Sequence, residues 1–127
     1  TYLIEYPSYT HRTEQALRDH FGDQFWITEK SFAHSSGFAG KCDLHSTEGI
    51  VVDFKTKESL EKASVYDDHI LQLSAYAYGL NMPNARCAIV FVSDHETKIC
   101  EIEPKDLELG YSKFLDLLSY FKKDKNI

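Results

Sequence analysis

The stretch GFAGKCDLHSTEGIVVDFKTK, from Gly37 to Lys57, decides the fold of this 127-residue chain. Its two strand-like runs, residues 38–45 and 50–55, predict a β-hairpin. Successive side chains of a strand point to opposite faces, so Asp53 and Lys55 share one face of the second strand. The apolar residues at even positions of that strand should supply the core from the other face.

A pair of carboxylates is expected across this hairpin. With the turn in residues 46–49, Asp43 lies opposite Asp53, and directly opposed residues have Cβ atoms about 4.5–5.5 Å apart. Two carboxylates so close repel each other unless a cation lies between them. Lys55 beside them completes a pattern typical of a metal-dependent hydrolytic site, although exposed Asp–Lys pairs are also common on ordinary protein surfaces.

The order of these residues resembles the PD-(D/E)XK nuclease superfamily, and in particular its RecB-like exonuclease branch. That branch includes the mitochondrial genome maintenance exonuclease and phage exonucleases. The resemblance rests on GFAGKCD, on VDFK, and on QLSAY at residues 72–76, and it covers about residues 14–120. It implies a restriction-endonuclease-like fold and hydrolysis of phosphodiester bonds in DNA.

The resemblance also implies roles for single residues. Asp43, Asp53 and the backbone carbonyl of Phe54 would bind Mg²⁺ or Mn²⁺ through oxygen, as these ions prefer. Lys55 would be the catalytic lysine. The number of metal ions stays open.

Helical residues add to this predicted site. Gln72 and Tyr76 are four residues apart on one helix face, and the resemblance implies that they order the site and the nucleic-acid strand. The relatives often add a helical His or Glu as a metal ligand. The candidates are His11, Glu14 and His20, and Glu14 is preferred because it lies mid-helix beside the apolar stripe.

Two residues leave alternatives open. Glu29, one strand before the hairpin, could reach the metal through water or form a structural pair with Lys41. His69 could contact nucleic acid from the start of its helix or simply belong to the turn.

Composition limits the classes of protein that fit. A length of 127 residues and 43% hydrophobic residues predict one domain over 1–127. No apolar run reaches the ~18 residues of a membrane span, and Thr1 to Pro7 lacks the pattern of a signal peptide. Three cysteines without CxxC spacing argue against disulfides and zinc, and favour an intracellular protein. The net charge of −6 excludes a broad basic surface, so nucleic acid would be held by locally grouped lysines.

The remaining segments predict an α/β sandwich with a central mixed sheet, in the order α-β-β-β-α-β-β-α. The expected helices are residues 8–21 with Ser8 or Thr10 as the cap, residues 68–80, and the segment from Pro104 through Phe121. The expected strands are residues 25–32, 38–45, 50–55, 85–93 and 98–103. Residues 57–67 are expected to form a polar, mobile loop.

The predicted function is that of a Mg²⁺- or Mn²⁺-dependent deoxyribonuclease, with an exonuclease as the first choice. The alternatives are an endonuclease of the same superfamily, a catalytically inactive nucleic-acid-binding module, and a structural domain with an incidental polar hairpin. The small size favours a virus- or phage-encoded enzyme that works with a protein partner or as a homo-oligomer.

Overall fold

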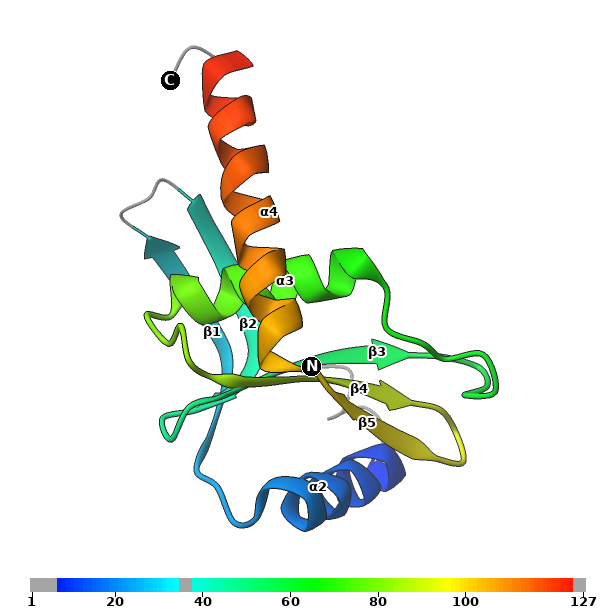
Figure 1. Cartoon of the computed structure of the whole chain (residues 1–127). Coiled ribbons are helices and arrows are strands. Elements are labelled where there is room, and N and C mark those ends of the chain that lie inside the picture. Colours follow the sequence, from blue (N-terminus) through cyan, green and yellow to red (C-terminus); the bar gives the residue numbers. More distant parts are fainter. Residues whose placement is uncertain (1–6, 35–37, 125–127) are drawn as a thin grey trace.

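A computed structural model, which describes residues 7–34 and 38–124, shows the predicted α/β sandwich with a central sheet (Figure 1). Its elements are α2 (Pro7–Phe21), β1 (Trp26–His34), β2 (Phe38–Ser46), β3 (Ile50–Thr56), α3 (Asp67–Gly79), β4 (Arg86–Val92), β5 (Thr97–Glu101) and α4 (Pro104–Asp124). The predicted order α-β-β-β-α-β-β-α is confirmed. Helix α2 begins at Pro7, so Ser8 and Thr10 lie inside the helix and the predicted cap is wrong.

The five strands form one mixed sheet in the order β1-β2-β3-β4-β5. Neighbouring strands are antiparallel except β3 and β4, which are parallel and are joined through α3. A parallel pair needs a long crossover connection, and a helix usually supplies it. The side chains from Cys87 to Val92 are fully buried, which confirms the prediction of a buried strand.

Each face of the sheet carries its own apolar cluster. One cluster lies under α3 and includes Leu73 and Ala77 of that helix together with Cys42, Val51, Cys87, Ile89 and Phe91 of the strands. The other lies against α2 and includes Leu17 and Phe21 of that helix together with Leu44, Ile50, Val52, Ala88, Val90 and Val92. Figure 1 shows α2 on one side of the sheet and α3 and α4 on the other. Each side chain of β3 therefore points either toward α2 or toward α3.

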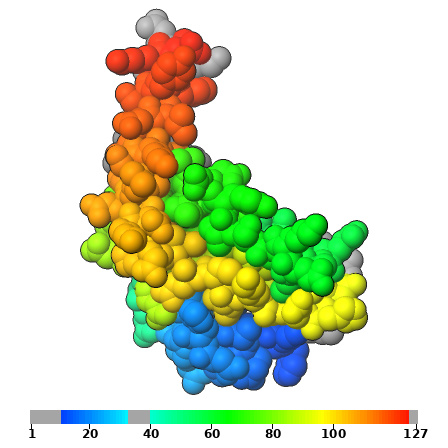
Figure 2. Space-filling model, turned by 45° about the vertical axis from the view of Figure 1, so that its right-hand side comes forward, coloured from blue at the N-terminus to red at the C-terminus, as the bar shows by residue number. Residues whose placement is uncertain are grey.

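Helix α4 packs its first half on α3 and then extends away from the rest of the molecule (Figure 2). The two helices approach closely at Gly110, where an added Cβ would lie 2.7 Å from Ser74 Oγ. That hydroxyl donates to the carbonyls of Ile70 and Leu107 and thereby joins the helices. A glycine inside a helix costs about 1 kcal/mol relative to alanine, and here the close approach explains its presence.

The connection between β3 and α3 is a loop, as predicted, but it is anchored to the core. Leu60 is 6% exposed and belongs to the cluster under α3, and Ala63 and Val65 pack against the same cluster. The predicted loop thus contains three apolar residues that pack on the core. In the part of the chain that the structure describes, no helix is both long and apolar enough to cross a membrane.

Candidate active site

Asp53 and Lys55 lie near the end of β3 on the face that is covered by α3. Val51 belongs to the apolar cluster under α3, and alternation along the strand carries residues 53 and 55 to the same side. The Lys55 Nζ atom lies 3.2 Å from Asp53 Oδ2. The Asp53 side chain is only 7% exposed, whereas the Lys55 side chain is 32% exposed. Asp53 and Lys55 are therefore not an exposed Asp–Lys pair of an ordinary protein surface, which was the alternative that the sequence allowed.

Asp43 lies next to Asp53 across the hairpin, as the predicted turn requires. Leu44 pairs with Val52, so the next position in the same register places Asp43 beside Asp53. One Asp43 oxygen accepts a hydrogen bond from the Phe54 backbone N–H at 3.0 Å. The peptide nitrogen of Phe54 thus fixes the carboxylate of Asp43. The proposed role of the Phe54 carbonyl as a metal ligand stays a prediction.

The strand pairing is interrupted beside Asp43. On β1, Thr28 pairs with Leu44 and Lys30 pairs with Cys42, but Glu29 between them has a φ of 52° and joins neither pair. The register is the same on both sides of Glu29, so no residue is inserted, and the positive φ of Glu29 interrupts the pairing only at the position opposite Asp43. The Glu29 carboxylate lies 4.0 Å from Lys41 Nζ, so the structure favours the ion-pair alternative for Glu29.

The carboxyl group of Asp53 is buried beside a second carboxylate. The pKa of Asp53 is raised to about 7, mainly because the group is buried and also because of the hydrogen bond to Asp43 and the negative charge of Asp43, while the Lys55 ammonium lowers the pKa by less. The Oδ2 atom is buried, and its close partner among the described residues is the Lys55 ammonium at 3.2 Å, an ion-pair contact that lacks good hydrogen-bond geometry. Two adjacent carboxylates with a buried oxygen of this kind fit a hard divalent cation, since Mg²⁺ is often held by one or two carboxylates while it keeps several waters.

Gln72 and Tyr76 meet each other above these carboxylates. The Gln72 side-chain amide donates to the Tyr76 hydroxyl at 2.8 Å. Burial raises the pKa of Tyr76, and the negative charges of Asp53 and Asp43 raise it further, so the phenol lies within electrostatic reach of both. The prediction that the two helical residues neighbour each other is confirmed.

Phe32 supports Tyr76, and the sequence analysis missed this residue. Its ring meets the Tyr76 ring edge-on, with 6.0 Å between the centroids. The same ring fills the space where a Cβ of Gly79 would lie, only 1.9 Å from the nearest ring atom, and it approaches Gly40 closely as well. The one sequence feature that could have indicated this contact was Gly79 at the end of a helix, where the missing side chain leaves room for a ring. Gly37, the first residue of the stretch that decides the fold, lies outside the described residues.

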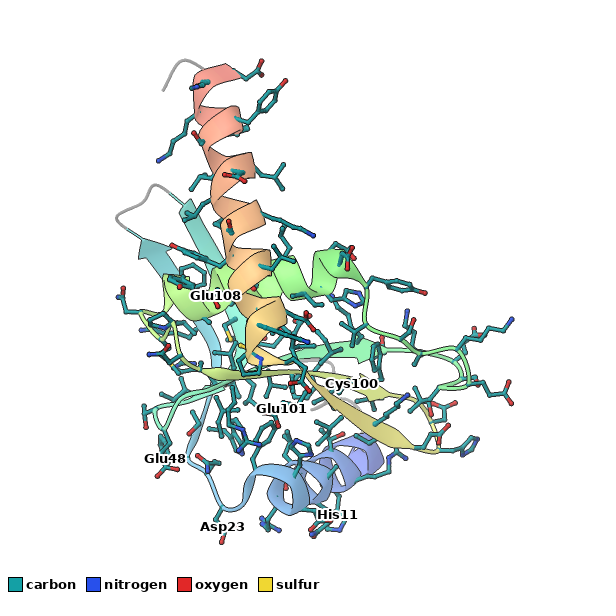
Figure 3. All side chains as sticks on the ribbon, viewed as in Figure 1. His11, Asp23, Glu48, Cys100, Glu101 and Glu108 are labelled. Atoms are coloured by element: carbon teal, nitrogen blue, oxygen red, sulfur yellow. The ribbon has the colours of Figure 1, made fainter. Side chains whose placement is uncertain are left out.

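The structure does not bring the predicted helical ligand to the site. Glu14 is exposed on α2, and α2 covers the face of the sheet opposite Asp53. The other two candidates share that layer, because His11 is exposed on the outer side of α2 (Figure 3) and His20 contacts Glu101 at 2.9 Å. The assignment of Glu14 as a metal ligand is therefore wrong. Within residues 7–34 and 38–124, no group of three or more His, Cys, Asp or Glu side chains could hold a metal.

A second charged cluster lies on the α2 side and is fully paired. Arg86 contacts Glu101 through two hydrogen bonds of 2.8 and 2.7 Å, and its guanidinium lies 4.8 Å from the centroid of the Phe21 ring. His20 contacts the same carboxylate. The hydrogen bonds from Arg86 are the largest cause that lowers the pKa of Glu101 to about 2. Figure 3 places Glu101 between the sheet and α2.

A hollow of about 500 Å³ lies elsewhere in the molecule. Its lining includes Ser74, Tyr78, Arg86, Cys87, Ile102 and Leu107. Arg86 pairs with Ile50 at the beginning of the parallel strands, whereas Asp53 and Lys55 lie toward their carboxyl ends. Ligands of open α/β sheets usually bind at the carboxyl ends of the strands, and the Asp53 carboxyl group, whose pKa is raised, also lies there. The hollow is therefore not the candidate active site.

The fold, a small α/β domain with a five-stranded mixed sheet, is that of the restriction-endonuclease-like class of α/β proteins. The alkaline exonuclease LHK-Exo from Laribacter hongkongensis is similar in structure, with a TM-score of 0.58 and 12% sequence identity over 92% of this chain and 70% of that chain. A crystal structure titled SSO0001 has a TM-score of 0.47 and 18% identity over 83% of this chain and 55% of that one. The chain thus spans about half the length of that second protein. No protein-family model matches the sequence, and no curated protein matches it.

Proposed function

We propose that this protein is a divalent-metal-dependent nuclease of the PD-(D/E)XK superfamily that hydrolyses phosphodiester bonds of DNA as an exonuclease. One observation carries the proposal. Asp53 is buried beside the carboxylate of Asp43, its pKa is raised to about 7, and the ammonium of Lys55 is its cationic partner at 3.2 Å. A buried charge without a full set of partners is expensive, so such a cluster is expected where a ligand completes it.

Asp43 and Asp53 would hold the metal, and the Phe54 carbonyl is an additional candidate ligand. The Phe54 N–H already fixes Asp43, so one carboxylate is oriented before a cation arrives. When bound, Mg²⁺ or Mn²⁺ polarises the scissile phosphate and lowers the pKa of a water molecule. Asp53 must lose its proton to bind the cation, and its raised pKa makes binding weaker below about pH 7.

Lys55 is well placed to act on the substrate. Its side chain is one-third exposed while its ammonium contacts the buried Asp53. From there it would orient the attacking water and offset the negative charge that develops on the phosphate in the transition state. The Tyr76 hydroxyl accepts a hydrogen bond from Gln72, and the Tyr76 ring lies edge-on to the Phe32 ring, so Tyr76 would brace the site from the helix above.

Because the net charge is −6, the protein would bind its substrate through a few local contacts between lysines and phosphates. Binding that depends on phosphate contacts scales with the number of lysines and arginines that touch the backbone. Lys55 and Lys57 follow Asp53 at the same end of β3. A protein partner or a second copy of the chain would supply further contacts with the strand.

The test compares end-labelled linear DNA with circular DNA, each single-stranded and double-stranded, with Mg²⁺, Mn²⁺ or a chelator. The proposal predicts metal-dependent release of nucleotides from linear DNA and no cleavage of circles. Cleavage of circles identifies an endonuclease instead. Binding without cleavage in any metal identifies an inactive binding module, and the absence of both binding and cleavage contradicts the proposal altogether. The matched control is Asp43→Asn, which keeps the side-chain volume and removes the charge.

A further inference from the structure

His69 lies in the first turn of α3, on the same side of the helix as Gln72 and Tyr76. The three residues are separated by three and four positions, which places them along one helical stripe. Figure 1 shows the first turn of α3 on the side of the molecule where β3 ends. Tyr76 lies toward Asp43 and Asp53, and His69 therefore extends the polar stripe beyond them.

Contacts of the imidazole ring place it beside Lys55. Its centroid lies 6.4 Å from that of Phe91, and Phe91 is the partner of Lys55 in the parallel pair of strands. The ring also lies 5.4 Å from the Tyr66 ring. His69 is half-buried, so it lines the end of the sheet without being enclosed in the core.

Hydrogen bonding fixes the tautomer of His69. Its Nδ1 atom accepts a hydrogen bond from the Tyr66 backbone N–H at 3.2 Å. A backbone N–H can only donate, so Nδ1 carries a lone pair and the ring proton sits on Nε2. Burial lowers the pKa of His69, and the charges of Lys55 and Lys57 lower it further, although Asp68 acts in the opposite direction. The ring is thus a neutral donor.

The Nε2–H group of this ring has no described acceptor. No hydrogen bond to it is formed by the residues in the described ranges. Helix capping accounts for Nδ1 alone, and it leaves Nε2 available beside two lysines at the end of β3. Neutral N–H donors are common partners of phosphate oxygens in nucleic-acid complexes.

We propose that the Nε2–H group of His69 donates a hydrogen bond to a backbone phosphate of the bound nucleic-acid strand, beside Lys55 and Lys57. This inference rests on the proposed function and adds a substrate-binding residue to it. The contact carries no charge, so it orients the strand without releasing a counterion. The stripe of His69, Gln72 and Tyr76 then follows the strand across the carboxylates.

Two substitutions separate capping from substrate binding. In His69→Asn the side-chain oxygen can take the place of Nδ1 and accept the Tyr66 N–H, but the amide is too short to replace Nε2. In His69→Gln the longer amide can place a donor near the Nε2 position. Kinetics with end-labelled single-stranded DNA, and its Kd measured in Ca²⁺, are compared for both variants below their melting temperatures.

The expected result is a KM and a Kd about tenfold higher in His69→Asn, with a wild-type kcat and melting temperature. His69→Gln should recover most of the affinity. The salt dependence of Kd should stay unchanged in His69→Asn, whereas Lys57→Gln should lower its slope by about 0.7, the value for one phosphate contact with a single strand.

Three outcomes would overturn the inference. A wild-type KM and Kd in His69→Asn would show that the residue only caps the helix. Equal loss of affinity in the Asn and Gln variants at unchanged stability would exclude the donor at Nε2, and a lower salt slope in His69→Asn would show a charged contact instead. A folded wild-type protein that cleaves no DNA contradicts the proposed function, and the Kd comparison in Ca²⁺ still tests His69.

Discussion

The two faces of the sheet carry two charged clusters that differ in how well their carboxylates are paired. On the α2 face, Glu101 accepts two hydrogen bonds from Arg86 and contacts His20, and its pKa is lowered to about 2. On the α3 face, Asp53 is more deeply buried, has the Lys55 ammonium as its only cationic partner among the described residues, and has a pKa raised to about 7.

If the proposed function is correct, this difference separates a structural cluster from a catalytic one. Arg86 and His20 pair with Glu101 within the protein, so that cluster stabilises the fold. The protein leaves Asp53 incomplete between Asp43 and Lys55, and this arrangement costs folding free energy. Strain of this kind persists at sites where a bound ligand relieves it. The predictions below test this contrast, from the largest effect to the smallest.

The first prediction concerns activity. Asp53→Asn or Lys55→Ala should reduce cleavage about a thousandfold or more, equivalent to roughly 4 kcal/mol of transition-state stabilisation. Glu101→Gln and Glu14→Gln should leave the specific activity of the folded protein unchanged, because both residues belong to the other face. Nuclease assays at saturating Mg²⁺ measure this difference. A fully active Lys55→Ala protein would remove Lys55 from the mechanism.

The second prediction concerns stability in the presence of a chelator. The folded-state pKa of Asp53 lies above its ordinary value of 3.8, so the folded protein holds this proton more tightly than the unfolded chain. Stability contributed by that proton is complete below about pH 4 and is lost as the pH rises to about 7. Asp53→Asn cannot ionise and should therefore be more stable than the wild type at pH 8, by roughly 2–4 kcal/mol.

Glu101→Gln should have the opposite effect on stability. The folded-state pKa of Glu101, about 2, lies below its ordinary value of 4.5, so its contribution is present above about pH 4.5 and is lost as the pH falls toward 2. The variant should lose only about 1 kcal/mol at pH 8, because solvent screens an exposed ion pair. Urea unfolding of both variants at several pH values tests the two signs. If the two substitutions changed the free energy of unfolding in the same direction, the proposed difference between the two clusters would be wrong.

The third prediction concerns metal binding. Mg²⁺ or Mn²⁺ should stabilise the folded protein by about 2.7 kcal/mol at a hundredfold excess over Kd. Asp43→Asn should abolish this stabilisation, and Glu101→Gln should keep it. Melting temperatures with and without the ions give the result. A wild-type melting temperature that does not respond to millimolar Mg²⁺ or Mn²⁺ would argue strongly against a metal at Asp43 and Asp53.

The fourth prediction concerns the helix above the carboxylates. Tyr76→Phe should slow cleavage about tenfold, or 1.4 kcal/mol, because it removes the hydroxyl that accepts from Gln72 and keeps the ring that packs on Phe32. Tyr78→Phe is the matched control on the same helix, since Tyr78 stacks on Tyr111. Equal activity of the two variants would show that Tyr76 serves only packing.

Much of the fold could be predicted from the sequence because its signals are local. The order of the eight elements follows from periodicity and from turn residues, and the register of the hairpin follows from the length of its turn. The boundaries moved where local signals compete, as at Pro7, where α2 begins before the predicted cap. The apolar anchor Leu60 within a polar loop was missed, because only the packed core decides which single leucine it buries.

The candidate site divides in the same way. The sequence by itself determined that Asp43, Asp53 and Lys55 gather on one hairpin, and that Gln72 and Tyr76 share one helix face, since strand alternation and helical period require it. Only the tertiary structure decided that Glu14 lies on the opposite face of the sheet, that the Phe32 ring fills the space beside Gly79, and that Asp53 is buried without a full set of partners. These facts depend on how layers pack across long sequence separations, which no local pattern encodes.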